Sequence, residues 1–200
     1  VGTLSEIILW GANATNDQNF ATSYIPTEGS IKTRLQDTAS GAGSSDLINS
    51  TEGVLYFEGS ALANDSYRYL SLSDGSNSNN VRFNLSPTAN QISFEVNSGG
   101  SLQLGYTNNS TDVLSNTKIA IKYKLNDFAV WINGFEVNTN SSGITPTGLN
   151  TLNFDRGTGG NVFLGKTKCV AVFKEALNND ELECLTGEGY DSFNALALAN

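Results

Sequence analysis

The sequence predicts an all-β fold in which two antiparallel sheets pack as a sandwich or jelly roll. Short segments of alternating apolar and polar residues recur along the chain, with Gly, Asn, Asp and Ser between them. Only 16% of the 200 residues are charged and 10% are aromatic, a composition that favours short strands and polar loops over long helices. Strands this short and evenly spaced are typical of sandwiches and jelly rolls.

The clearest strands lie between residues 118 and 137, KIAIKYKLNDFAVWINGFEV. Asn126-Asp127 and Asn133-Gly134 supply two tight turns, because these residue types tolerate a positive φ. If both loops have two residues, the apolar side chains share one buried face through the pairs Leu125–Phe128, Tyr123–Val130, Ile121–Ile132 and Ile132–Phe135. The opposite face then carries Trp131 between Lys122 and Glu136.

The remaining elements divide the chain into an arm and a compact domain. A strand is expected over 4–10 and loops up to residue 49, so residues 1–46 are expected to be an extended arm that ends a preceding module. The compact domain is expected over 47–200. Its other strands are expected at 53–61, 66–75, 80–86, 91–97, 101–107 and 167–176, with two more around a glycine-rich turn in 148–166.

One short helix is expected near the C-terminus, in LNNDELECLTG. Asn178 and Glu181 have the spacing of a capping box, Leu177 and Leu182 that of a hydrophobic staple, and Gly187 marks the end. A second short helix is expected over 191–200.

Charge and composition exclude several functions. The net charge of −9 argues against a nucleic-acid partner, and no apolar run is long enough to insert into a membrane. The chain has no His, which removes the usual general base. A glycosidase needs two carboxylates at one bond, but Glu181 and Glu183 diverge on the expected helix, and the strand glutamates are isolated. The sequence therefore predicts a protein that is not an enzyme.

Two aromatic clusters are candidates for binding carbohydrate. A sugar ring stacks its C–H groups on an aromatic face while polar neighbours bond its hydroxyls, and Trp131 with Lys122 and Glu136 fits this pattern. The alternative is that Trp131 only packs against the Lys122 stem or in a subunit interface. Tyr67 and Tyr69 share one face of an expected strand, where a tyrosine ring more often packs in the core.

The loops offer weak candidates for calcium, and no cofactor is otherwise indicated. Asp74, Asn77 and Asp155 supply oxygen atoms, but calcium takes six to eight oxygens and each loop has one carboxylate. A turn built from Asp, Gly and Asn is the favoured interpretation. Cys169 and Cys184 would form a disulfide if the helix packs beside the strand, or remain separate thiols.

Taken together, several stretches resemble a known family. STEGVLYFEGS, LSLSDG, KIAIKYKLNDFAVWINGFEV and FLGKTKCVAVFKEALNNDELECLTG resemble the laminin-G-like, concanavalin-A-type lectin domains of structural and tail-fibre proteins of tailed bacteriophages. The N-terminal WGANATNDQNFATSYIPTEGSIKTR resembles a phage pattern that links two modules. The resemblance implies a domain on the exposed surface or tail of a virion, and hence an extracellular one that contacts the host. It also implies a homo-oligomer, such as a trimer, that contacts other virion proteins.

Three functions remain open at this stage. The first is a non-enzymatic virion domain that binds host-surface glycan. The second is a decoration, spacer or oligomerisation module of the virion that binds no glycan. The third is an accessory domain of a polysaccharide-degrading enzyme.

Overall fold

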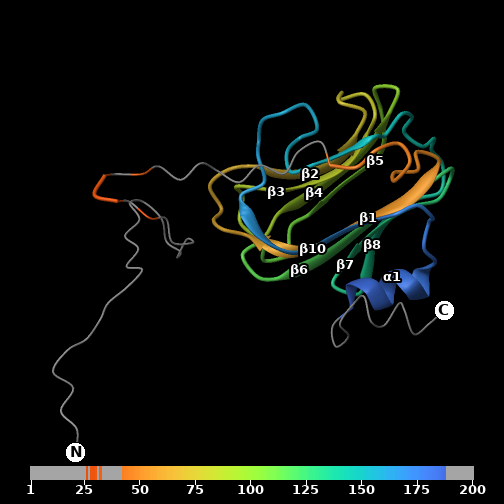
Figure 1. Cartoon of the computed structure of the whole chain (residues 1–200). Coiled ribbons are helices and arrows are strands. Elements are labelled where there is room, and N and C mark those ends of the chain that lie inside the picture. The colour runs from red at the N-terminus through yellow and green to blue at the C-terminus, as the bar shows by residue number, and fades with distance from the viewer. Residues whose placement is uncertain (1–25, 27, 31, 33–41, 188–200) are drawn as a thin grey trace, which may run out of the picture. The chain divides into compact units, whose positions relative to one another are not determined.

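The computed structural model describes residues 26, 28–30, 32 and 42–187 (Figure 1). The chain divides into the units Val1–Thr38 and Ala39–Asn200. In the first unit, the described residues form a turn in which Glu28 and Gly29 have positive φ. The strand expected over 4–10 and the helix expected over 191–200 lie outside the described residues, and the boundary after residue 46 stays a prediction.

The described part of the second unit is a sandwich of two five-stranded antiparallel sheets, in the orders β10-β1-β6-β7-β8 and β5-β4-β3-β2-β9 (Figure 1). The expected all-β jelly-roll sandwich with one short helix is therefore confirmed. The elements are β1 Glu52–Ala61, β2 Arg68–Ser73, β3 Asn80–Leu85, β4 Ile92–Ser98, β5 Ser101–Asn108, β6 Thr117–Lys124, β7 Phe128–Ile132, β8 Phe135–Asn140, β9 Thr151–Asn153, β10 Gly165–Phe173 and α1 Asn179–Thr186.

The main core lies between the sheets and is built by strand alternation. Every second residue of the central strands points inward, so Phe57 packs against Phe83 with ring centroids 5.1 Å apart. The meander residues expected in the core are confirmed there, namely Ile119, Ile121, Tyr123, Phe128, Val130 and Ile132.

Helix α1 covers the outer face of the sheet that contains β1, β6 and β7 (Figure 1). Leu182 and Leu185 pack there on Trp131, in a second apolar cluster with Val54 and Tyr56. The expected capping box is confirmed: Glu181 N donates to Asn178 Oδ1 at 3.0 Å, and Asn178 N donates to Glu181 Oε2 at 2.8 Å. Cys169 and Cys184 are both free thiols.

The expected register of the first hairpin is wrong by two residues. Ile132 pairs with Ile119 rather than with Ile121, because the two-residue turn is Leu125-Asn126 instead of Asn126-Asp127, and Asp127 N closes it by donating to Lys124 O at 2.9 Å. A shift of two preserves the inward face, since side chains alternate with a period of two. Leu125, expected in the core, is instead exposed on this turn.

The second hairpin keeps the expected pair Ile132–Phe135 but not the expected burial. An irregularity between Val130 and Trp131 shifts the register of β8, and Phe135 is 73% exposed. The expectation that Phe135 lies in the core is therefore wrong.

The glycine-rich segment 148–166 contains one strand, β9, instead of the expected two. Residues 154–164 are a loop that bonds along β2: Ser71 Oγ donates to Asp155 O at 2.9 Å, and Tyr69 N donates to Asn161 O at 3.1 Å. This loop covers part of the outer face of the sheet β5-β4-β3-β2-β9 and defines the edge of the candidate site.

Candidate functional site

The outward face of the sheet β5-β4-β3-β2-β9 is polar along its whole width. Inward residues such as Phe83 and Phe94 lie in the core, so their neighbours point outward. The register aligns one row across five strands, with Ser71 beside Arg82 and Glu95 beside Gly105. The outward residues of the three central strands are Tyr69, Ser71, Ser73, Asn80, Arg82, Asn84, Ser93, Glu95 and Asn97.

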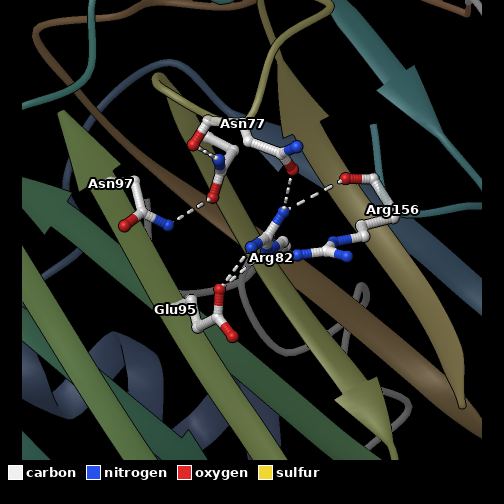
Figure 2. Close-up of polar contacts among 6 residues, drawn as sticks. Asn77, Arg82, Glu95, Asn97 and Arg156 are labelled. Atoms are coloured by element: carbon white, nitrogen blue, oxygen red, sulfur yellow. Dashed lines mark hydrogen bonds and ion pairs between the residues drawn. The ribbon is translucent and has the colours of Figure 1, made fainter. Parts of the chain in front are cut away.

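Arg82 is the centre of a hydrogen-bonded network on this face (Figure 2). It is only 4% exposed, and its Nε donates to Glu95 Oε2 at 2.9 Å. The same oxygen also accepts a hydrogen bond from Arg82 Nη2. Its Nη1 donates to Asn77 Oδ1 at 3.0 Å and to the Arg156 carbonyl at 3.4 Å. A planar guanidinium with several fixed partners is rigid, so it holds Glu95 and Asn77 in defined positions.

A chain of amides extends the network toward the end of the sheet. Asn97 Nδ2 donates to Asn80 Oδ1 at 3.0 Å, and Asn80 Nδ2 donates to the Asn77 carbonyl at 2.9 Å (Figure 2). These bonds fix the orientation of Asn97, whose Oδ1 has no bond to a described residue.

The loop 154–164 divides the face into a covered and an open part. It packs over β2, where Ser73 Oγ donates to the Gly157 carbonyl at 3.3 Å. A Cβ at Gly157 would lie 2.9 Å from Ser73 Oγ, and Gly157 has a φ of +92°, so only glycine fits this close approach. Ser71 and Ser73 are buried, while the β4 and β5 side of the face stays open.

Tyr69 lies beneath two arginines at the boundary of these parts. The guanidinium carbon of Arg82 is 5.6 Å from the ring centroid and that of Arg156 is 5.9 Å away. Burial raises the pKa of the Tyr69 hydroxyl, and the negative charge of Glu95 adds to the effect. Tyr69 therefore stays neutral and offers its ring face to both cations.

Tyr67 and Tyr69 share a face as expected, with ring centroids 6.4 Å apart. That face is the outward one, but Tyr69 is 8% exposed and is buried as expected, whereas the interpretation of Tyr67 as a core residue is wrong. Tyr67 is 47% exposed at the rim. Tyr106, on β5, points to the other side of its sheet, where it stacks on Phe94.

The open part combines polar and aliphatic groups. The side chain of Glu95 is 32% exposed, and Asn97 is half-buried. Gly105 lies beside Glu95, and the exposed side chain of Leu102 lies over this glycine, 2.8 Å from where a Cβ would be. Fixed acceptors and donors beside an aliphatic surface suit a ligand that has both hydroxyl and C–H groups.

The expectation that Trp131 faces solvent is wrong, because the residue is only 5% exposed and lies beneath α1. Its Nε1 is buried without a hydrogen-bond partner among the described residues. Lys122 lies opposite Ala129 instead of Trp131, and its Nζ pairs with Asp127 Oδ1 at 2.7 Å. Lys122 and Glu136 do line one polar hollow of about 180 Å³.

The calcium candidates use their oxygens within turns. Asp74 Oδ1 accepts from Ser76 N at 2.8 Å and Oδ2 accepts from Asn79 Nδ2 at 2.9 Å. Asp155 Oδ1 accepts from Gly157 N at 2.6 Å, and Asn77 Oδ1 is bonded to Arg82. Residues 42–187 contain no group of three Asp, Glu, Cys or His side chains placed to hold a metal.

Arg82 and Arg156 were not among the residues singled out from the sequence. The usable signal was the opposite charge of Arg82 and Glu95 at the centres of two neighbouring alternating strands. Arg156 gave no such signal, since its position depends on how the loop 154–164 folds back.

No protein-family model matches the chain. No curated protein matches it either. Within the described residues, no helix is long and apolar enough to cross a membrane.

Solved structures with the same architecture are found at low sequence identity. The CBM40 domain of the Ruminococcus gnavus IT-sialidase is 15% identical with a TM-score of 0.57, over 75% of this chain and 95% of that one. The same domain bound to α2,3-sialyllactose is 17% identical with a TM-score of 0.57, over 74% and 94%. A heptameric SAP-like pentraxin from Limulus polyphemus is 12% identical with a TM-score of 0.58, over 76% of each chain. The likeness shows that this chain has a lectin-like jelly-roll fold.

Proposed function

We propose that this domain binds carbohydrate, without catalysing a reaction, through the open part of the outward face of β5-β4-β3-β2-β9. The observation that supports it is the Arg82-centred network, which presents Glu95, Asn77 and Asn97 in fixed positions at a solvent-exposed surface. We name this surface, formed by Asn77, Glu95, Asn97, Leu102 and Arg156, the β4 face.

The chemistry of the β4 face matches that of a saccharide. A carboxylate oxygen and an amide accept and donate hydrogen bonds to vicinal hydroxyls, and the exposed Leu102 provides a surface for C–H groups. Because Arg82 fixes Glu95 before binding, little side-chain entropy is lost when a ligand binds.

The fold supports the same conclusion at a coarser level. One of the similar structures is a CBM40 domain bound to α2,3-sialyllactose. A single exposed carboxylate without a second one facing it is suited to binding rather than to glycoside hydrolysis. We propose Lys122 and Glu136 as a second, separate region that contacts the glycan, while Trp131 only packs beneath it.

We infer from the resemblance to phage lectin-like domains that the domain lies on the exposed surface or tail of a virion. Its ligand would be a host-surface glycan. The domain would form a homo-oligomer that contacts other virion proteins. This role is extracellular.

A structural module of the virion is the second candidate function. Phe135 is 73% exposed and borders a hollow of about 780 Å³ together with Gly134 and Cys184. An exposed aromatic of this kind favours contact with another subunit. Under this alternative, Phe135→Ser dissociates the oligomer, and neither the wild type nor the variant binds glycan.

Glycan-array binding of the full chain tests the proposed function, with Glu95→Gln and Glu136→Gln as a matched pair. Both variants lose one carboxylate, but only Glu95 lies on the β4 face, so Glu95→Gln should weaken binding at least tenfold and Glu136→Gln should not. Thermal denaturation checks that both variants are folded. An array without any bound glycan contradicts the proposal, while loss of binding by Glu136→Gln alone moves the site to the opposite sheet.

A further inference from the structure

The β4 face holds more positive charge than its own residues neutralise. Arg82 is paired with Glu95, and both of its contacts go to the same oxygen, Oε2. Arg156 has no ion pair among the described residues, although its guanidinium lies within 6 Å of the same Tyr69 ring as that of Arg82. Only one of the two guanidinium groups is therefore paired with a carboxylate, in a chain whose net charge is −9.

Arg156 also has an unmet hydrogen bond. Its Nε is buried and has no partner among the described residues. A buried donor without an acceptor is destabilising, and such groups are rare in folded proteins. Figure 2 shows the Arg156 side chain reaching from the loop after β9 toward Arg82 over the sheet.

The position of Arg156 is fixed by its own backbone. Its carbonyl accepts from Arg82 Nη1 at 3.4 Å, and its N–H donates to the Gly160 carbonyl at 3.3 Å. The side chain is half-buried, so its outer guanidinium edge remains within reach of a ligand. Because its backbone is anchored on Arg82, Arg156 is a fixed cation at the rim of the β4 face.

We propose that the ligand of the β4 face is an acidic saccharide whose carboxylate pairs with Arg156. This inference rests on the proposed function and adds the ligand class. A carboxylate matches the planar fork of a guanidinium with two parallel hydrogen bonds. A neutral sugar would accept hydrogen bonds from the outer guanidinium edge but would leave the positive charge unpaired.

The arrangement also assigns the two ends of the ligand. The carboxylate lies at Arg156, on the loop side, and the ring hydroxyls lie toward Glu95 and Asn97 on β4. Glu95 repels a carboxylate that binds in the reverse orientation, so the two charges select one orientation.

The test uses two matched pairs of probes, measured by isothermal titration calorimetry on the full chain. The pairs are α2,3-sialyllactose with lactose and methyl β-D-glucuronide with methyl β-D-glucoside. In at least one pair, the acidic member should bind at least tenfold more tightly than the neutral one, and this preference should fall as salt rises. Sodium acetate, as an anion without a sugar ring, should bind far more weakly.

Arg156→Gln and Lys174→Gln form the matched variants. Each loses one positive charge, but Lys174 is an exposed residue just after β10, on the other sheet. Arg156→Gln should abolish the preference for the acidic member, while Lys174→Gln should leave the preference unchanged.

Several results overturn the inference. They are equal binding of both members in each pair, a preference that survives Arg156→Gln, or acetate binding as tightly as the saccharide. Neutral glycans that bind through Glu95 leave the proposed function standing while refuting the ligand class. Absence of binding to every saccharide refutes both.

Discussion

At the residue scale, a single buried arginine organises the candidate site. Arg82 bonds to Glu95, Asn77 and the Arg156 carbonyl and lies against the ring of Tyr69. The alternation of β3 and β4 is visible in the sequence, and it places Arg82 and Glu95 on one face. The link to Arg156 was not predictable, because it depends on a loop that returns over the sheet from 74 residues further along the chain.

The burial of Trp131 also depends on a distant segment and was not predictable from its own strand. Its side of the strand was correctly predicted, since alternation sets it opposite to Val130. Whether that side faces solvent depends on the docking of α1, whose residues 179–186 follow much later in the chain. Periodicity within one strand cannot reveal a cover supplied by a distant element.

Glu58 is expected to make stability depend on pH. It is 5% exposed, and its Oε1 accepts from Lys168 Nζ at 2.7 Å and from Asn116 Nδ2 at 3.0 Å. Burial by itself raises the pKa of Glu58, but the bonds from Lys168 and Asn116 outweigh it and lower the pKa. Its stabilising contribution is therefore present above the pKa of the unfolded chain and is lost as the pH falls through the lower folded pKa.

Glu58→Gln should lower the free energy of unfolding at pH 7 by about 1–3 kcal/mol, because a charged acceptor is replaced by a neutral one. Urea denaturation at pH 7 and pH 3 measures this difference. The variant should lose less stability than the wild type between the two values, whereas the exposed Glu136→Gln should follow the wild type. Parallel losses in Glu58→Gln and wild type would contradict the role given to Glu58.

At the element scale, structures specified by local signals were predicted and those specified by distant contacts were not. The helix α1 begins and ends where its capping residues and Gly187 indicated. The β6–β7 register was wrong because the two-residue turn lies one residue earlier than the Asn-Asp signal indicated. The second strand expected in 148–166 does not form. Phe163 is buried in the core, but the segment around it is a loop without strand pairing.

Asn178→Ala should loosen α1 from the sheet. Losing the side-chain bond to Glu181 N costs about 1 kcal/mol. Because Trp131 packs under Leu182 and Leu185, its fluorescence reports the docking of the helix. In a Trp10→Phe background, where Trp131 is the remaining tryptophan, the midpoint in urea should fall. Asn179→Ala, one residue into the helix and exposed, should leave the midpoint unchanged.

Gly59→Ala should damage the pairing of β1 with β10. A Cβ there would lie 2.1 Å from the Lys166 carbonyl oxygen, a backbone atom, at the point where the register between the two strands shifts. The expected loss of stability is about 3 kcal/mol, measured by thermal denaturation. Gly75→Ala, which meets no atom within 4 Å but has a φ of +89°, should cost about 1 kcal/mol. Equal effects would show that the close approach does not matter.

At the scale of the whole molecule, the two sheets have unlike outer faces. One is apolar around Trp131 and is closed by α1, while the other is polar and is closed only over β2 by the loop 154–164. The common core between them keeps both faces rigid. This asymmetry fits the proposal that one outer face contributes stability and the other binds the ligand.

The two roles should therefore separate in mutants. Leu185→Ala removes a fully buried side chain of α1 that packs on the sheet and should lower stability by about 2–5 kcal/mol, with the affinity for the glycan unchanged below the melting range. Asn97→Ala should cost about 1 kcal/mol through its bond to Asn80 while removing the ligand contact. A ligand that binds only the folded state raises Tm, so saturating glycan should raise the Tm of wild type and Leu185→Ala but not that of Asn97→Ala. Thermal denaturation with and without the best glycan from the array measures all six values, and an equal rise in Asn97→Ala would place the binding site elsewhere.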